Sequence, residues 1–191
     1  MILFVDETEF DNAFLVAGLL VNSREEANLA FKSFKNSIRN IRIPEKDKPI
    51  VYSEFKSTLL DRRYRKIKYK MLDSISEINP HIFYSCYSKK SKQFLQDEKE
   101  AAYIMLLERI ASACNCDISI IFDTFNKRDF EERIINNLSK LEFVQAIMPQ
   151  DSQKEAGLKY IDNICSVLRM HLTDSDENIF YEMIVNCSFV V

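Results

Sequence analysis

An aspartate stands at or just beyond the end of three apolar runs: Asp6 after ILFV, Asp123 after ISIIF and Asp151 after FVQAIM. Short apolar runs of this kind predict buried strands, and ligands of an open α/β sheet gather at the carboxyl ends of its strands. If the three strands are neighbours, their terminal carboxylates converge on one edge. Like charges that are crowded and removed from water must either take up protons or bind a cation.

The cation that suits such a cluster is a hard divalent ion such as Mg²⁺ or Mn²⁺, because these ions prefer oxygen ligands. Two such ions about 4 Å apart can activate a water and stabilise the leaving oxygen when a phosphodiester is cleaved. A simpler interpretation also exists for each residue, since aspartate is common in turns. Asp151 and Ser152, for example, could only cap the last helix.

Strands and helices that position these acids alternate along the chain. The pattern predicts a hairpin made of Ile2–Val5, with Asp6 and Glu7 at its end, and Phe14–Val21. Further strands are expected over 81–87, 118–122 and 143–148, and over the apolar tail from Ile179 to Val191. Helices are expected after the cap Ser23 and over about 57–78, 98–113, 128–141 and 153–171, with a loop over 43–49. This alternation favours a mixed sheet flanked by helices, an α/β fold.

Composition indicates a single globular domain over residues 1–191. The chain has only two glycines and four prolines, so it offers little material for linkers. Its net charge of −3 gives no global argument for nucleic acid. The opening MILFVDETEF lacks a basic signal-peptide region, and no apolar run is long enough to span a membrane. Five cysteines without a CxxC pair are expected to be free, mostly buried thiols in a reducing cytoplasm.

Several short motifs, taken in order, resemble the domain-of-unknown-function 3800 family. They are FVDET, FLVAGLLV, SEFKSTLLDRRYRK, IIFDTF and QDSQKEAGLKYIDNI, and they cover the chain from residue 3 to about 168. The resemblance implies a ribonuclease-H-like fold and a metal-dependent nuclease site, generally in bacterial and phage proteins, some of them associated with phage defence. Members of the family have an acidic motif near the start, a Glu-x-His before a helix, an acid after a middle strand, a DS pair and an acid on the last helix.

Carried over position by position, the resemblance implies a set of acidic site residues in this chain. The metal ligands would be Asp6, Glu7, Glu54, Asp123 and Asp162. The catalytic acids would be Asp6, Glu54, Asp123, Asp151 and Asp162, with the choice between Asp151 and Asp162 as the last ligand left open. Ribonuclease-H-like sites generally use an acid on the first strand and another on a later strand, which Asp6 and Asp123 fit best.

This sequence departs from the family pattern at accessory positions. Thr8 replaces a serine and keeps the hydroxyl, whereas Lys56 stands where the family has histidine. Lys159 stands where glutamine is usual, and Asn163 stands where an apolar residue is usual. A lysine beside a metal cluster could bind phosphate, or it could neutralise carboxylates in a site that has lost its metal.

The densest basic stretch of the chain follows Glu54. Its cations include Lys56, Arg62, Arg63, Arg65 and Lys66, and it could grip a nucleic-acid backbone beside the acids. The alternative is a solvated helix face whose charge is taken up by Glu45 or Asp47.

The leading hypothesis is therefore a Mg²⁺- or Mn²⁺-dependent nuclease that acts on DNA or RNA. The alternative is a catalytically impaired ribonuclease-H-like binding or regulatory module that acts through a protein partner, favoured by Lys56 and Lys159. A homodimer formed through the apolar tail is a weaker option.

Overall fold

We describe the chain from a computed structural model. The structure describes residues 1–10, 13–49, 51–52, 63–88, 96–125, 128–173 and 178–185. Its elements are β1 (Ile2–Phe10), β2 (Ala13–Val21), α1 (Arg24–Ser37), η1 (Glu45–Asp47), α3 (Arg65–Ser76), β3 (His81–Ser88), α4 (Gln96–Cys114), β4 (Ile118–Asp123), α5 (Arg128–Leu138), β5 (Val144–Gln150), α6 (Ala156–Thr173) and α7 (Asn178–Val185).

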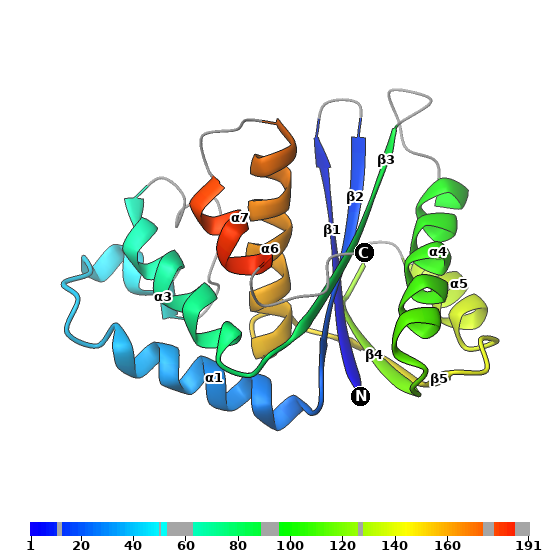
Figure 1. Cartoon of the computed structure of the whole chain (residues 1–191), viewed down its shortest axis with the longest axis horizontal. Coiled ribbons are helices and arrows are strands. Elements are labelled where there is room, and N and C mark those ends of the chain that lie inside the picture. The colour runs from blue at the N-terminus through cyan, green and yellow to red at the C-terminus, as the bar shows by residue number, and fades with distance from the viewer. Residues whose placement is uncertain are drawn as a thin grey trace.

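The strands form one mixed sheet in the order β3-β2-β1-β4-β5. Strand β2 runs antiparallel to β1 and to β3, whereas β4 is parallel to both β1 and β5. Helices α4 and α5 cover one face of the sheet, and α6 lies against the other with α1, α3 and α7 beyond it (Figure 1). The expected α/β architecture, a mixed sheet flanked by helices, is confirmed by this arrangement.

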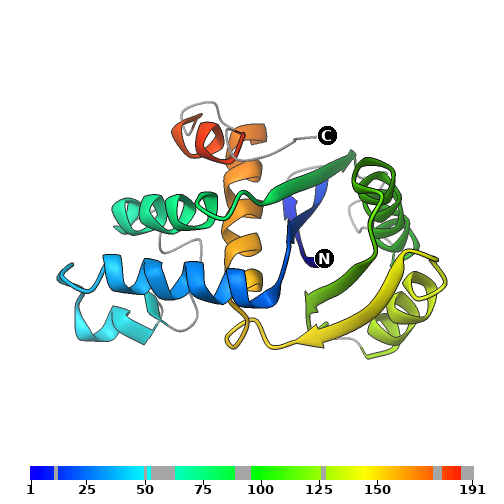
Figure 2. The ribbon, with the colours of Figure 1, turned by 60° about the horizontal axis from the view of Figure 1, so that its bottom comes forward.

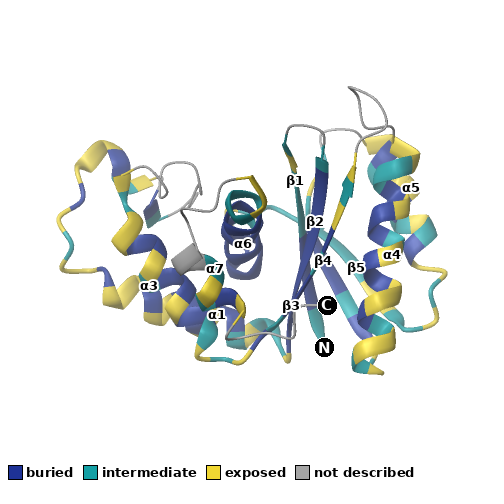
Figure 3. Cartoon of the chain, turned by 45° about the horizontal axis from the view of Figure 1, so that its top comes forward, coloured by how far each residue is buried: buried dark blue, intermediate teal, exposed yellow. Residues whose placement is uncertain are grey.

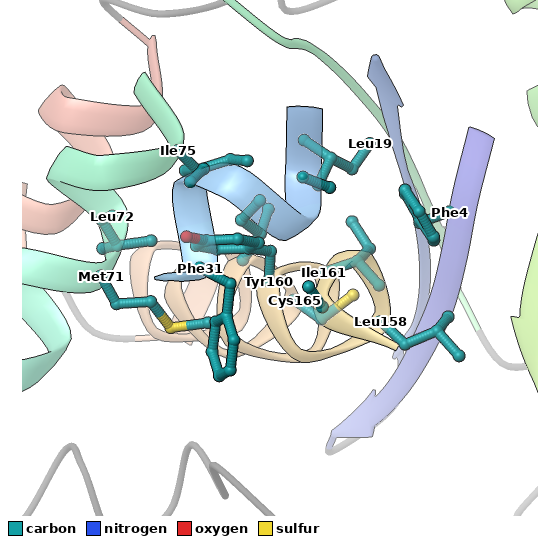
Figure 4. Close-up of a cluster of buried hydrophobic side chains, with 14 of the residues drawn as sticks. Phe4, Leu19, Phe31, Met71, Leu72, Ile75, Leu158, Tyr160, Ile161 and Cys165 are labelled. Atoms are coloured by element: carbon teal, nitrogen blue, oxygen red, sulfur yellow. The ribbon is translucent and has the colours of Figure 1, made fainter. Parts of the chain in front are cut away.

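Strand β1 divides its side chains between two apolar cores. Leu3 and Val5 pack with α4 and α5, whereas Phe4 packs with α1 and α6, because successive side chains of a strand point to opposite faces. Figure 4 shows Phe4 beside Leu158, Ile161 and Cys165 of α6. Each face of the sheet is therefore sealed by its own layer of helices.

Helix α6 is the most deeply buried helix of the described chain (Figure 3), with buried residues from Ala156 to Leu168. It packs closely on β1 at Gly157, since a Cβ added there would lie 2.2 Å from Cε2 of the Phe4 ring. Glycine is therefore required at this position by the close approach of the helix to the strand.

One sequence-based boundary, the end of the first strand, is wrong in a way that matters for the site. Strand β1 does not end at Val5 but continues to Phe10, so Asp6 and Glu7 lie within a strand. The antiparallel pairing of β1 with β2 continues to Phe10 and Ala13. The parallel pairing of β1 with β4 ends earlier, at Val5 and Phe122, so β1 extends beyond it.

Smaller differences occur near the C-terminal side. Strand β5 extends to Gln150, and α6 begins at Ala156, after a turn, so neither Asp151 nor Ser152 is adjacent to its first residue. The tail that was expected to be β is helical over the described residues Asn178–Val185. Its apolar run NIFYEMIV suits a short amphipathic helix that packs on α3 and α6 as well as it suits a strand.

The expected Ser23 cap of α1 is confirmed. Ser23 accepts a hydrogen bond from the Glu26 backbone N–H at 3.2 Å, and Phe31 and Phe34 are buried. The four described cysteines are free thiols, but only Cys165 is buried, so the expectation of mostly buried thiols is wrong for this part of the chain. Within the described residues, none of the helices combines the length and apolar character needed to cross a bilayer.

Candidate metal-binding site

Asp6 and Asp123 lie side by side at the end of the parallel ladder between β1 and β4. The last paired residues are Val5 and Phe122, and each aspartate is the next residue of its strand. Two residues earlier, Phe4 and Ile121 are partners that both pack in the core below α6. Because side chains alternate along a strand, both carboxylates point to the α6 face of the sheet.

Asp162 approaches the same place from the opposite side, on α6. Helix α6 lies along β1 (Figure 1), held there by the contact between Gly157 and Phe4. One turn beyond Asp162, the thiol of Cys165 donates to the backbone carbonyl of Asp6 with 3.6 Å between Sγ and O. This face of α6 therefore points at the stretch of β1 that carries Asp6.

Burial raises the pKa of Asp6 well above its usual value, and the negative charges of Asp162, Glu7 and Asp123 raise it further. The Glu7 backbone N–H acts in the opposite direction, donating to Oδ1 of Asp6 at 2.8 Å. A carboxylate in this environment is stabilised either by a proton or by a cation.

Backbone hydrogen bonds fix the position of Asp123. Its Oδ1 accepts from the N–H of Thr124 at 3.0 Å and from the N–H of Ser152 at 3.2 Å. The second bond ties the end of β4 to the turn after β5. The sequence motif DS thus has a structural role through Ser152, in addition to any role of its aspartate.

Glu7 points to the other face of the sheet from Asp6. There Tyr103 of α4 donates its hydroxyl to Glu7 Oε2, and Lys99 lies 3.9 Å from Glu7 Oε1 and 2.5 Å from Glu9 Oε1. Burial raises the pKa of Glu7 from 4.5 to about 7, Lys99 lowers it, and Glu9 and Asp123 raise it. Glu7 is thus held by partners from α4 rather than directed at α6.

Asp151 serves the turn that leads into α6. Its Oδ1 accepts from the N–H of Gln153 at 2.9 Å, and its Oδ2 lies 3.7 Å from Nζ of Lys154. Asp162, and not Asp151, is among the charges that raise the pKa of Asp6. The contacts of Asp151 are therefore those of a turn residue, as the simpler interpretation expected.

The basic stretch that was expected to bind nucleic acid lies only partly within the described residues. Glu54, Lys56 and Arg62 lie outside the described residues. Arg63, Arg65 and Lys66 are exposed, and α3 lies on the far side of α6 from β1 in each view (Figures 1 and 2). Asp47 accepts from the Tyr64 hydroxyl at 2.5 Å and lies 4.0 Å from Arg63, as the alternative interpretation expected.

The donor atoms around Asp6 are carboxylate oxygens, the type of ligand that a hard divalent ion prefers. Carboxylates from β4 and α6 raise the pKa of Asp6 on β1, and oxygen is the donor that Mg²⁺ and Mn²⁺ prefer. As placed, no group of three or more His, Cys, Asp or Glu side chains in the described part of the chain forms a ready metal-binding arrangement. Metal binding would require these side chains to rotate toward one another.

Tyr103, Lys99 and Cys165 are neighbours of the site that the sequence did not predict. The first two belong to a helix expected from apolar periodicity, and Tyr103 is buried in the core below that helix. Alternation along β1 could have placed Glu7 opposite Asp6 once the strand was known to continue. No sequence signal pairs Cys165 with Asp6.

No protein-family model matches this chain, and no curated protein matches it. Among solved structures, the chain is similar to a mutant of Bst-RNase HIII, with 15% sequence identity and a TM-score of 0.47. The match covers 88% of this chain and 52% of that chain, so this chain spans about half the length of the structure it matches.

Proposed function

We propose that this chain binds Mg²⁺ or Mn²⁺ and hydrolyses phosphodiester bonds in nucleic acid. The observation that carries the proposal is the placement of Asp6 and Asp123 on one face at the end of a parallel ladder, opposite Asp162 of α6. Crowded carboxylates of this kind are stabilised by a cation. The proposed ligands are these three residues, with Glu54 as a further ligand implied by the family resemblance.

Bound divalent ions would supply an activated water and neutralise charge on the leaving oxygen. The chain itself would orient the ligands. Asp123 is held by two backbone N–H groups through one oxygen, which leaves Oδ2 for a ligand role. Asp6 is held through Oδ1 by one backbone N–H. Membership of the domain-of-unknown-function 3800 family, and with it a role in phage defence, stays a prediction of the resemblance.

The test is cleavage of labelled DNA and RNA, as single strands, duplexes and hybrids, with Mn²⁺ and with EDTA. Asp6→Asn and Asp123→Asn are expected to reduce Mn²⁺-stimulated cleavage at least about a hundredfold, the order of loss typical when an essential catalytic group is removed. The matched control is Asp129→Asn, an exposed aspartate in the first turn of α5, which is expected to cleave like the wild type. A wild-type protein that is inert on all these substrates would reject the proposal.

The alternative, a binding module without turnover, predicted that Lys56 or Lys159 neutralises the acid cluster. Lys56 lies outside the described residues. Lys159 lies 4.9 Å from the centre of the Phe31 ring instead, and Lys35, Asp151 and Glu155 are charges that influence it. The contacts of Lys159 therefore do not favour the module over the enzyme.

A further inference from the structure

Lys159 is a buried cation in the first turns of α6. Only 7% of the residue is exposed, and its ammonium rests 4.9 Å from the centre of the Phe31 ring of α1. Within the described chain, no carboxylate lies within ion-pairing distance of this ammonium. A buried charge without a close partner is costly, and an aromatic ring offsets that cost only in part.

A second cation lies against the same ring. Lys35, four residues after Phe31 on α1, is exposed and has its ammonium 5.2 Å from the ring centre. It too forms no ion pair with a described residue. Two ammonium groups thus share one phenyl ring, where each would gain from a common anion.

The nearest acids do not supply that anion, because they have other partners. Glu155 accepts from Arg24 through both carboxylate oxygens. Asp151 is held by the Gln153 N–H and lies near Lys154. Burial lowers the pKa of Lys159, Lys35 lowers it further, and Asp151 and Glu155 oppose the shift without cancelling it.

Lys159 lies on the same helix as Asp162, one of the proposed metal ligands. Lys159 precedes Asp162 by three residues, which places the two side chains on neighbouring parts of the α6 surface. The turn that carries Asp151 also donates the Ser152 N–H to Asp123. Figure 2 shows this turn between β5 and the start of α6, beside α1. The first turn of α6 contains no acidic residue, so its N-terminal end adds positive potential.

We propose that Lys159 and Lys35, held on Phe31, form a phosphate subsite that binds one backbone phosphate of the nucleic-acid strand whose phosphodiester is cleaved at the carboxylates. This proposal rests on the proposed function and replaces the segment from Arg63 to Lys66 as the main electrostatic grip. Lysine suits this role because it acts as a compact point charge toward phosphate. A lysine at a position where the resembled family has glutamine thereby gains a function specific to this chain.

The test is equilibrium binding of a fluorescent oligonucleotide in EDTA, which separates binding from hydrolysis. Lys159→Met keeps the length and the packing on Phe31 but removes the charge. Lys35→Met removes the second charge at an exposed position, where folding is not at risk. Each is expected to weaken binding roughly tenfold at low salt. Each is also expected to reduce the slope of log Kd against log salt by about 0.7 to 0.9, the value for one lost phosphate contact.

Lys32→Met is the matched control, an exposed lysine of α1 beside Phe31 in sequence, and it is expected to bind with the wild-type slope. Wild-type affinity and slope in both Lys159→Met and Lys35→Met would overturn the subsite. Thermal unfolding with inorganic phosphate distinguishes a site for free phosphate from a site for a strand phosphate. If inorganic phosphate stabilises the wild type while oligonucleotide binding is unchanged in both variants, the assignment to a strand is wrong.

The two proposals can fail separately. Weakened binding in the two lysine variants of a protein that never cleaves would support the subsite and reject the nuclease. Efficient Mn²⁺-dependent cleavage with unchanged binding in both variants would support the nuclease and reject the subsite.

Discussion

After burial of its own carboxyl, the charge of Asp162 on α6 is the largest cause that raises the pKa of Asp6 on β1, ahead of Glu7 and Asp123. The two residues come from opposite ends of the described chain, and α6 brings them together by packing on β1. We therefore propose Asp162, rather than Asp151, as the third acidic group of the candidate site.

Replacing these two aspartates should separate their roles. Mn²⁺ should raise the melting temperature of the wild type and of Asp151→Asn, because an ion bound only by the folded state stabilises it by RT ln(1 + [L]/Kd). At a hundred times Kd this amounts to about 2.7 kcal/mol. Asp162→Asn should lose most of the shift. Thermal unfolding with and without Mn²⁺ measures it, and a shift that survives in Asp162→Asn but vanishes in Asp151→Asn would assign the ligand to Asp151.

Asp6→Asn should stabilise the metal-free protein at neutral pH. The pKa of Asp6 is raised in the folded state, so its ionised form favours the unfolded chain once the pH exceeds the ordinary value of an aspartate. Asparagine removes the charge and keeps an oxygen for the Glu7 N–H. In denaturant unfolding in EDTA at pH 7.5, Asp6→Asn should raise the free energy of unfolding more than the control Asp129→Asn does. A loss of stability would show that the Asp6 charge is already compensated.

Glu7 should make the stability of the protein depend on pH. Its folded pKa of about 7 lies above the unfolded value of 4.5, so the folded state binds more protons between these values. Stability should therefore rise as the pH falls from about 7 toward 4.5, by at most about 3 kcal/mol from this group. Glu7→Gln should flatten that part of the profile. Urea unfolding at a series of pH values measures it, and Glu131→Gln, on α5, is a carboxylate-to-amide control.

Gly157→Ala should disturb both the fold and the site. Its Cβ would fall 2.2 Å from the Phe4 ring, so α6 must move away from β1. Overpacking of this kind costs about 1 to 3 kcal/mol, and the movement should also weaken Mn²⁺ binding by separating Asp162 from Asp6. Adding Phe4→Leu should recover part of the metal affinity by making room.

Gly18→Ala provides the comparison for that variant. The Cβ there would lie 2.9 Å from Cδ1 of Leu3, at the end of a flexible side chain, and far less displacement is needed. Unfolding and Mn²⁺ titration of both glycine variants check the difference. Equal losses of Mn²⁺ affinity would indicate a general loss of stability rather than movement of α6.

The sequence predicted most strands and helices because their apolar periodicity agrees with their final burial. It predicted Asp123 at a strand end correctly, since β4 stops there. It misplaced Asp6, because the acids after Val5 resemble a turn, whereas pairing with β2 holds them in an extended strand. Residue type allowed the turn role of Asp151 as one of two interpretations, whereas the contact of Glu7 with Tyr103 depends on tertiary packing that residue types alone do not encode.

The apolar tail is a second place where residue types alone did not predict the structure. Short apolar runs with aromatic residues fit the pattern of a strand and of a buried helix equally. The surface against which such a run packs determines which of the two forms. Here the flank of α3 and α6 is available, and Asn178–Val185 folds as α7 against it.

The close packing of α6 on β1 also has a consequence during synthesis. A ribosome releases the strand with Asp6 more than 150 residues before the helix with Asp162, so a growing chain cannot complete the acidic site until α6 has emerged and docked. Contacts between such distant segments form late and slowly. By topology alone, a growing chain from which α6 has not yet emerged lacks Asp162 and therefore the complete acidic site.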